Sequence, residues 1–242
     1  MPSLSPYKSD LDYAYAPGIF PAMECLLHRP DSARRVLLHS KAEGTEGAEK
    51  LTRLAEQLHV RVEMADKALA RISGKENCFA AAVFAKFDDA LAGDRPHVVL
   101  HHPSDCGNVG TILRTALGFG VEDVALIRPC VDVFDPRVVR ASMGALFQLR
   151  VRTYDSFAQY ESEHPARMLC PFMLDGSRSL PDVLAGDVKD RWTLIFGNEG
   201  SGLPAEFSRM GQPVRIPSND RVDSLNLSIA AAIGIYGFTQ KK

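Results

Sequence analysis

Residues 214–238 read VRIPSNDRVDSLNLSIAAAIGIYGF, and this stretch decides how the C-terminal part of the chain folds. Its first residues are typical of a strand end, the middle is a polar loop, and the remainder has the apolar character of a helix. Ser224 stands where the apolar period begins, so we expect it to cap free backbone N–H groups, with Asn226 beside it. A capped helix buried in a core has the same pattern, so this stretch alone does not establish a site.

Two further stretches have the same order of strand, loop and helix. NVGTILRTA, residues 108–116, follows the strand-like run His97–His102, and FGNEGSGLP, residues 196–204, follows the strand-like run Trp192–Phe196. Open α/β sheets bind ligands at the carboxyl ends of their strands. Three polar junctions in one sheet therefore predict a single shared site.

In this order the three stretches resemble the motifs of the SpoU (TrmH) class of SPOUT RNA ribose 2′-O-methyltransferases. The matching patterns are N-x-G-x-x-x-R-T-A, G-N-E-G-x-G-L, and I-P followed by S-L-N-x-S-x-A, between Asn108 and Tyr236. The resemblance implies an α/β fold with a C-terminal SPOUT trefoil-knot domain, a mostly parallel sheet, and S-adenosyl-L-methionine as cofactor. It also implies methyl transfer to a ribose 2′-hydroxyl of structured RNA. We favour rRNA over tRNA, because two-domain relatives of this kind mostly modify rRNA.

The 242 residues suffice for one large or two modest domains. Short strands and helices alternate between residues 30 and 87, which predicts a small α/β domain. This part resembles the ribosomal L30e-like domain that many SpoU-class enzymes carry. We therefore assign residues 1–90 to an L30e-like RNA substrate-binding domain, whose first residues, about fifteen, form a loose arm. Residues 97–242 form the methyltransferase domain, and the charged segment 88–96 is the expected linker.

Composition limits the other functions. The net charge is −2, so a surface that binds RNA needs locally clustered cations. The chain shows no signal-peptide pattern and no apolar run of about 18 residues, which predicts a cytoplasmic protein without a membrane segment. Five widely spaced cysteines without a C-x-x-C pair indicate reduced thiols. His101 and His102 should point to opposite faces of a strand, so they do not predict a metal site.

The resemblance assigns roles to individual residues. The catalytic positions are Asn108, Arg114, Glu199, Ser224 and Asn226, and the cofactor-binding positions are Gly197, Ile216, Leu225 and Ser224. Because a guanidinium keeps its proton in proteins, we expect Arg114 to bind a phosphate and steer the 2′-hydroxyl. Glu199 either pairs with Arg114 and orients it, or accepts the hydroxyl proton after burial raises its pKa.

Two other functions fit part of the pattern. A knotted RNA-binding protein that has lost catalysis would keep the fold, but it has no physical need for all five polar catalytic positions. Another nucleotide-binding α/β enzyme is a second alternative. The glycines of GNEGSG do not have the G-x-G-x-x-G spacing of dinucleotide-binding loops, so a nicotinamide enzyme is disfavoured.

The C-terminal helix also predicts an assembly. Residues 229–236 are almost all small or apolar, and a helix that is apolar all round needs cover on every side. A second copy can cover one side through a two-fold contact. The resemblance to SpoU-class enzymes points the same way. We therefore expect a homodimer through this helix and part of the helix predicted at residues 108–119.

Overall fold

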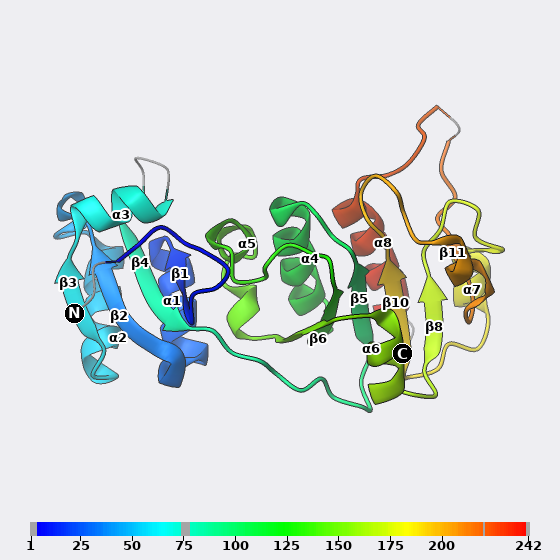
Figure 1. Cartoon of the computed structure of the whole chain (residues 1–242), viewed down its shortest axis with the longest axis horizontal. Helices are drawn as coiled ribbons and strands as arrows, with labels where there is room; N and C mark the ends of the chain where they lie inside the picture. Colours follow the sequence, from blue (N-terminus) through cyan, green and yellow to red (C-terminus); the bar gives the residue numbers. More distant parts are fainter. Residues whose placement is uncertain (1–3, 74–77, 220, 241–242) are drawn as a thin grey trace. The chain divides into compact units, whose positions relative to one another are not determined.

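The computed structural model describes residues 4–73, 78–219 and 221–240, and the chain divides into two compact units (Figure 1). The first unit comprises Met1–Phe87 and Asp132–Gln148, and the second comprises Asp88–Val131 and Leu149–Lys242. This division differs from the expected one at residues 132–148. They pack with the first unit, although they lie inside the stretch assigned to the methyltransferase domain.

The first unit is built on a four-stranded mixed sheet with the strand order β1-β4-β2-β3. Strand β4 is antiparallel to both β1 and β2, and β2 is parallel to β3. The strands are β1 (Tyr13–Pro17), β2 (Ala33–Leu38), β3 (Arg61–Met64) and β4 (Ala80–Ala85). The helices are α1 (Ile19–His28), α2 (Glu46–Gln57), α3 (Asp66–Ser73) and α5 (Pro136–Ala141), with short 3₁₀ turns η1 (Pro30–Ser32), η2 (Ser40–Ala42) and η3 (Ala145–Phe147).

Residues 5–9 are held against this unit and do not form the loose arm expected from the sequence. The Tyr15 hydroxyl donates to the Ser5 carbonyl at 2.6 Å, and the Tyr7 hydroxyl donates to Asp132. Lys86 Nζ donates to the Ser9 carbonyl at 2.8 Å. Strand β1 and helix α1 were not predicted because β1 is buried on both faces, which removes the alternation of an amphipathic strand.

The second unit contains a five-stranded parallel sheet with the order β7-β6-β5-β10-β8, which confirms the predicted mostly parallel sheet. The strands are β5 (His97–His101), β6 (Asp123–Ile127), β7 (Arg150–Tyr154), β8 (Met168–Pro171) and β10 (Trp192–Phe196), beside the small pair β9 (Arg178–Ser179) and β11 (Val214–Arg215). The helices are α4 (Cys106–Gly118), α6 (Phe157–Glu163), α7 (Leu180–Ala185) and α8 (Leu227–Thr239), with a 3₁₀ turn η4 (Ala205–Arg209).

The strand order reverses between β5 and β10. The chain adds β6 and β7 on one side of β5 and then returns to form β8 and β10 on the other side. Such a reversal leaves a crevice at the carboxyl ends of the two central strands, which is where open α/β sheets bind ligands. Two of the three polar junctions follow these two strands.

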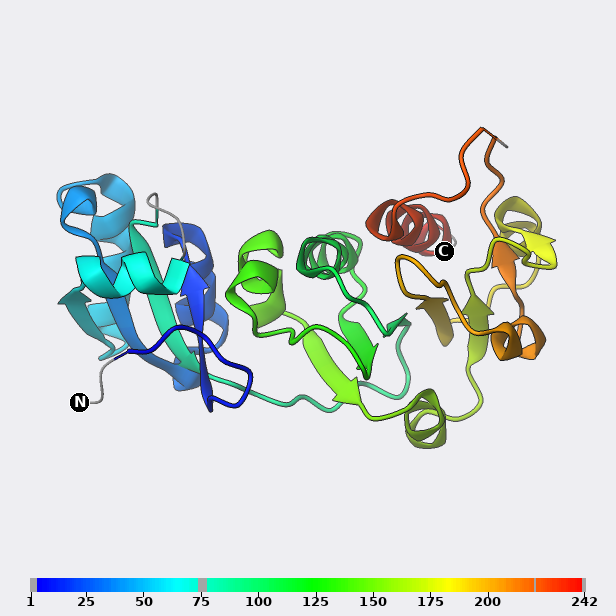
Figure 2. The ribbon, with the colours of Figure 1, turned by 45° about the horizontal axis from the view of Figure 1, so that its top comes forward.

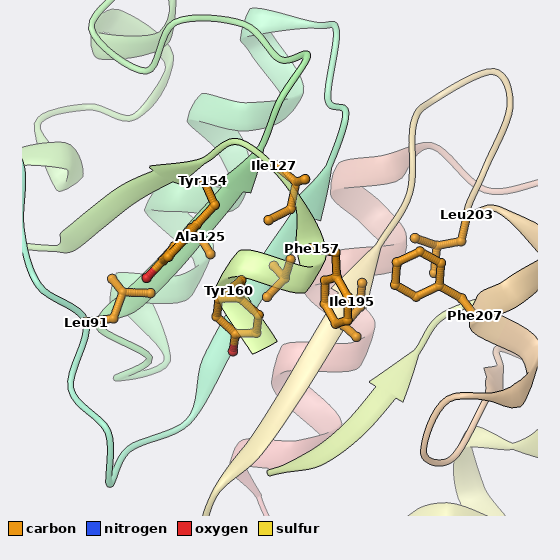
Figure 3. Packing of buried hydrophobic residues seen from close by; sticks show 10 residues of the cluster. Leu91, Ala125, Ile127, Tyr154, Phe157, Tyr160, Ile195, Leu203 and Phe207 are labelled. Atoms are coloured by element: carbon orange, nitrogen blue, oxygen red, sulfur yellow. The ribbon is translucent and has the colours of Figure 1, made fainter. Parts of the chain in front are cut away.

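Both faces of the parallel sheet are covered. Helices α4 and α8 lie on one face and α6 on the other (Figure 2). The face beneath α6 carries a hydrophobic cluster that is rich in aromatic side chains (Figure 3). Its buried members are Leu91, Val99, Ala125, Ile127, Tyr154, Phe157, Tyr160, Ile195, Leu203 and Phe207. This packing holds the central strands, and therefore their carboxyl ends, in fixed positions.

The predicted linker is largely part of the second unit. Leu91 belongs to the hydrophobic cluster, and the Ala92 main-chain N–H donates to Asp123 at 2.8 Å. The buried Arg167 guanidinium donates to the Gly93 carbonyl at 3.1 Å. These contacts fix residues 91–93, so the segment free to act as a linker is shorter than predicted. In the described part of the chain, no helix has the length and apolar character needed to cross a membrane.

Candidate functional site

A cavity of about 440 Å³ lies at the carboxyl ends of β8 and β10 in the second unit. Three loops line it: the loop after β8, the loop after β10, and the segment from β11 to α8. Five predicted site residues are among its lining: Gly197, Glu199, Ile216, Ser224 and Leu225. The cavity is therefore formed where the sequence predicts the cofactor.

The loop after β10 closes so tightly that glycine is required at two positions. Asn198 and Gly202 exchange main-chain hydrogen bonds of 3.2 and 3.0 Å. A Cβ atom on Gly197 would stand 2.2 Å from the Gly202 carbonyl carbon, and Gly202 itself has φ +67°. A side chain at either position would clash or strain the backbone. The turn presents its main chain directly to the cavity.

Asn198 organises this turn and ties it to the end of β5. Its side-chain oxygen accepts from the Gly200 and Ser201 main-chain N–H groups at 2.9 and 3.1 Å. Its amide nitrogen donates to the His102 carbonyl at 2.9 Å. The first contacts fix the shape of the turn, and the last fixes its position beside the neighbouring strand.

Glu199 joins the β10 junction to the β5 junction. Its carboxylate accepts from the Ser104 hydroxyl at 2.7 Å and from the main-chain N–H groups of Ser104 and Asp105 at 3.0 Å each. It also accepts from the Asn108 side-chain amide at 3.2 Å. Both carboxylate oxygens are therefore occupied by donors from the start of α4.

Asn108 continues the chain of contacts to the third junction. Asp105 caps α4 by accepting from the Asn108 main-chain N–H at 2.7 Å, which leaves the Asn108 side chain free to bridge. The Asn108 side-chain oxygen accepts from the Asn226 amide at 3.0 Å. Hydrogen bonds thus connect residues of all three polar junctions, in the order Glu199, Asn108, Asn226.

The prediction that Ser224 caps the last helix is wrong. Helix α8 begins at Leu227, and its cap is Asn226, whose side-chain oxygen accepts from the Ser228 main-chain N–H at 2.9 Å and the Ser228 hydroxyl at 2.6 Å. The loop continues further than the apolar pattern suggested, because Leu225 belongs to the cavity lining and not to the helix. Ser224 is an exposed loop residue that lines the cavity.

The structure corrects both roles expected for Glu199. Burial alone raises the pKa of its carboxyl, but the hydrogen bonds from Ser104 and Asn108 outweigh burial and lower the pKa to about 2. A carboxylate with so low a pKa is a weak base at neutral pH and does not suit proton abstraction. Among the described residues Glu199 forms no ion pair with Arg114. Its carboxylate instead links the loop after β10 to the loop after β5 and so acts as a structural brace between them.

Among the predicted site residues, Arg114 alone neither belongs to this hydrogen-bond network nor lines the cavity. It is exposed on α4, and its side chain makes no hydrogen bond or ion pair with any residue that the structure describes. An exposed guanidinium without a protein partner is available to bind a phosphate from outside the chain.

Sequence reasoning missed Ser104, Asp105 and Asn198 as site residues. Ser104 and Asp105 directly precede the first helix of the site, and serine and aspartate at such a position are a cap signal that could have been used. Asn198 lies within the G-N-E-G motif, but no pattern indicated that its side chain holds the turn.

His101 and His102 do not point to opposite faces as predicted. Their ring centroids are 3.8 Å apart with an interplanar angle of 32°. His102 has φ +57°, so it leaves the extended conformation on which the alternation depends. Within the residues described, no group of three His, Cys, Asp or Glu side chains is arranged to hold a metal ion.

A prediction about pH tests the brace. Glu199→Gln should remove a stabilisation that is present above pH 4.5, the ordinary value of the carboxyl, and that is lost as the pH falls toward 2. Because the carboxylate is partly exposed, we expect roughly 1–2 kcal/mol, less than the full shift would give. Urea unfolding at about pH 6 and about pH 3 measures it: the gap between wild type and variant should shrink in acid.

The matched control is Asp175→Asn, which removes another carboxylate of the same cavity. Asp175 makes no hydrogen bond or ion pair with a described residue, so its loss should leave the stability nearly unchanged at both pH values. A gap for Glu199→Gln that stays constant from pH 6 to pH 3 would contradict the assigned role.

Known proteins are similar to this chain in sequence and in fold. The chain is similar to an uncharacterised tRNA/rRNA methyltransferase of Synechocystis, with 30% identity over 190 residues that cover 76% of this chain and 68% of the relative. A 23S rRNA (adenosine(1067)-2′-O)-methyltransferase of Streptomyces laurentii is 30% identical over 61% of this chain, which spans about half of that relative, 54%. The structure of the SpoU methyltransferase AviRb of Streptomyces viridochromogenes, in complex with AdoMet, superposes with a TM-score of 0.79 at 23% identity, covering 95% of this chain and 90% of that one.

The structural likeness shows the fold, which is the SPOUT fold implied by the three motifs. The family match covers the C-terminal part of the chain, residues 95–236, and is to the SpoU rRNA Methylase family. This range contains every predicted site residue. The chain therefore belongs to the SpoU rRNA Methylase family, and with it to the RNA 2′-O-ribose methyltransferases of the SpoU class.

Proposed function

We propose that this protein transfers a methyl group from S-adenosyl-L-methionine to a ribose 2′-hydroxyl of structured RNA, with rRNA favoured over tRNA. The observation that carries the proposal is the hydrogen-bonded chain from Glu199 through Asn108 to Asn226 beside the cavity. It holds three loops in one arrangement, as a site that must align two bound molecules requires. We expect this reaction to take place in the cytoplasm.

The residues around the cavity fit the proposed cofactor. Its volume of about 440 Å³ lies within the usual range of small-molecule sites. The main-chain N–H groups of Ile216 and Leu225 have no hydrogen-bond partner among the described residues, so they can donate to a ligand. Together with the main chain of Gly197, which also lines the cavity, they would hold the adenosine. When bound, S-adenosyl-L-methionine supplies an electrophilic methyl group on its sulfonium.

The charge distribution supports RNA as the partner despite the net charge of −2. Arg114, Arg215 and Arg221 are exposed and form no ion pair with a residue that the structure covers. Arg215 lines the cavity, and Arg221 precedes the lining residue Val222. By contrast, Arg128, Arg150 and Arg152 of the same unit are paired with carboxylates. The unpaired cations are thus available for phosphates near the proposed site.

The direct test is methyl transfer. Purified protein, tritium-labelled S-adenosyl-L-methionine and rRNA from cells that lack this protein should give labelled RNA, and mapping of 2′-O-methyl groups should locate one nucleotide. Asn108→Ala is expected to lose this activity because it breaks the bridge between the three loops. If the wild type binds S-adenosyl-L-methionine and RNA but transfers no methyl group to rRNA or tRNA, the alternative of an inactive knotted RNA-binding protein is correct.

We infer that the first unit is the L30e-like substrate-binding part. It has an α/β architecture, and many SpoU-class enzymes carry such a domain before the methyltransferase part. Deleting residues 1–90 is not a clean test, because Phe134, Val138 and Phe147 of segment 132–148 would lose their partners in the first unit. Point substitutions on the surface of the unit are the appropriate probes.

We also propose that the protein forms a homodimer through α8. One side of this helix is buried, whereas Ile229, Ile233 and Tyr236 are 51%, 37% and 54% exposed at helical spacing. Phe119, at the end of α4, is 40% exposed, and its ring packs against Tyr236 with centroids 5.6 Å apart. A continuous apolar face of this kind is typical of an interface with a second copy.

Ile233→Glu is therefore expected to shift the protein from dimer to monomer by at least tenfold in dissociation constant, because a charge would be buried at the interface. Analytical ultracentrifugation measures the change. Leu27→Glu, on α1 of the first unit, replaces a leucine that is 52% exposed and serves as the control. A monomeric wild type at micromolar concentration, or a variant that dimerises as tightly as wild type, would show that α8 is not the interface.

A further inference from the structure

We propose that His39 and Phe79 of the first unit form a stacking site for an unpaired RNA base. The inference deepens the proposed function, since it names the part of the RNA that this unit contacts. Phe79 is 39% exposed, although phenylalanine side chains favour burial. Its ring meets the His39 ring edge to face, with centroids 5.9 Å apart and an interplanar angle of 89°.

The pair is fixed in place before any ligand binds. His39 follows β2 and Phe79 precedes β4, and the His39 main-chain N–H donates to the Phe79 carbonyl at 2.9 Å. The His39 ring nitrogen Nδ1 accepts from the Lys41 main-chain N–H at 3.1 Å, which sets the direction of the ring. The two rings stand at the ends of the two central strands of the sheet. Rings held in this way lose little conformational freedom on binding, which favours affinity.

The surroundings of the two rings suit a phosphate backbone. Lys41 directly follows Ser40, and Lys67 directly follows Asp66. Ser40 links the two segments, because it donates to Asp66 through its main-chain N–H at 2.8 Å and through its hydroxyl at 2.6 Å. Both lysines are exposed, and neither forms an ion pair with a described residue. The Asp66 carboxylate lies 3.6 Å from His39, but Ser40 occupies both of its oxygens.

Most other cations of this unit are already neutralised. Ion pairs to carboxylates are made by Arg34, Arg35, Lys50, Arg53, Arg61, Lys86 and Arg137. Lys41 and Lys67 are therefore among the few charges of the unit that can contact RNA phosphates. An exposed aromatic ring next to unpaired cations is the combination that binds single-stranded nucleic acid by stacking. A duplex buries the faces of its bases, so the expected ligand is a loop or a bulge.

The test measures binding of a fluorescein-labelled oligoadenylate of about twelve nucleotides by anisotropy. Phe79→Ala should weaken binding by roughly 5- to 100-fold, whereas Phe79→Trp should retain it because the stacking face is kept. Binding of an RNA duplex of equal length should change little in either variant. Phe20→Ala, which removes a phenylalanine that is 50% exposed on α1, is the matched control and should bind as wild type.

Three results would overturn the proposal: wild type that does not bind the oligoadenylate, Phe79→Ala that binds it as tightly as wild type, or an equal loss for the duplex. A urea unfolding transition close to that of wild type shows that Phe79→Ala is folded. The proposed methyl transfer is tested separately with wild type and rRNA. If no methyl transfer is found, the oligoadenylate-binding result can still be interpreted. If the stacking proposal is wrong, the proposal of methyl transfer is not affected.

Discussion

Arg114→Lys is expected to lower the rate of methyl transfer by roughly 100-fold or more, which corresponds to about 2.7 kcal/mol of transition-state stabilisation. The variant keeps the positive charge. It loses the planar fork that can hold a phosphate or carboxylate through two parallel hydrogen bonds. Because Arg114 does not line the cavity and its side chain has no hydrogen bond or ion pair with a described residue, the fold should be kept, and the affinity for S-adenosyl-L-methionine should stay within about twofold of wild type.

Single-turnover kinetics at saturating RNA separate the two effects, with cofactor titration by calorimetry as the second measurement. Arg209→Lys is the matched control, since Arg209 is also exposed in the second unit and also has no ion pair within the described residues. It should transfer methyl groups at the wild-type rate. Substantial turnover by Arg114→Lys would show that charge alone suffices and that the fork is not used.

Gly197→Ala should cost roughly 2–4 kcal/mol of stability and abolish cofactor binding. The added methyl group would stand 2.2 Å from the Gly202 carbonyl carbon and 2.4 Å from the Leu203 nitrogen. Both neighbours are backbone atoms, so the turn can accept the methyl group only by breaking the paired hydrogen bonds between Asn198 and Gly202. The opened turn would no longer present its main chain to the cavity.

The control lies three residues further along the same turn. A Cβ atom on Gly200 would meet the Asn198 side-chain oxygen at 3.6 Å, which is an ordinary contact. Gly200→Ala should therefore unfold in urea close to wild type. Equal destabilisation of both variants would mean that the turn tolerates no side chain anywhere, and that the close approach at Gly197 is not the cause.

The sequence predicted most of the second unit because its signals are local. Strand β10 has the predicted bounds Trp192–Phe196, and the remaining strands of the parallel sheet agree within a few residues. Helix α7 and strand β9 were missed, since six and two residues are too few for a periodic pattern. The sequence pattern also predicts a strand over residues 168–174, but strand β8 ends at Pro171, because the following residues turn to line the cavity.

The sequence predicted which residues belong to the candidate site, but not the hydrogen bonds that connect them. The motifs indicated that Asn108, Glu199 and Asn226 belong together, yet they carried no information on which groups donate to which. The low pKa of Glu199 depends on hydrogen bonds from Ser104 and Asn108, and both residues are far from Glu199 in the sequence. Sequence spacing cannot show such contacts. For the same reason, no pattern showed that residues 132–148 pack with the first unit.

The packing of residues 132–148 with the first unit affects the order in which the two units can fold during protein synthesis. The first unit cannot be completed when residue 87 leaves the ribosome, because α5 and the turn that follows it are not yet made. Residues 88–131, which include β5 and β6, must emerge in between and wait for β7 and the later strands of their own sheet. Domains usually fold one after another as they are translated. Here the first unit can be completed only after residue 148 has emerged, when β5 and β6 of the second unit are already made and their later neighbours in the sheet are not.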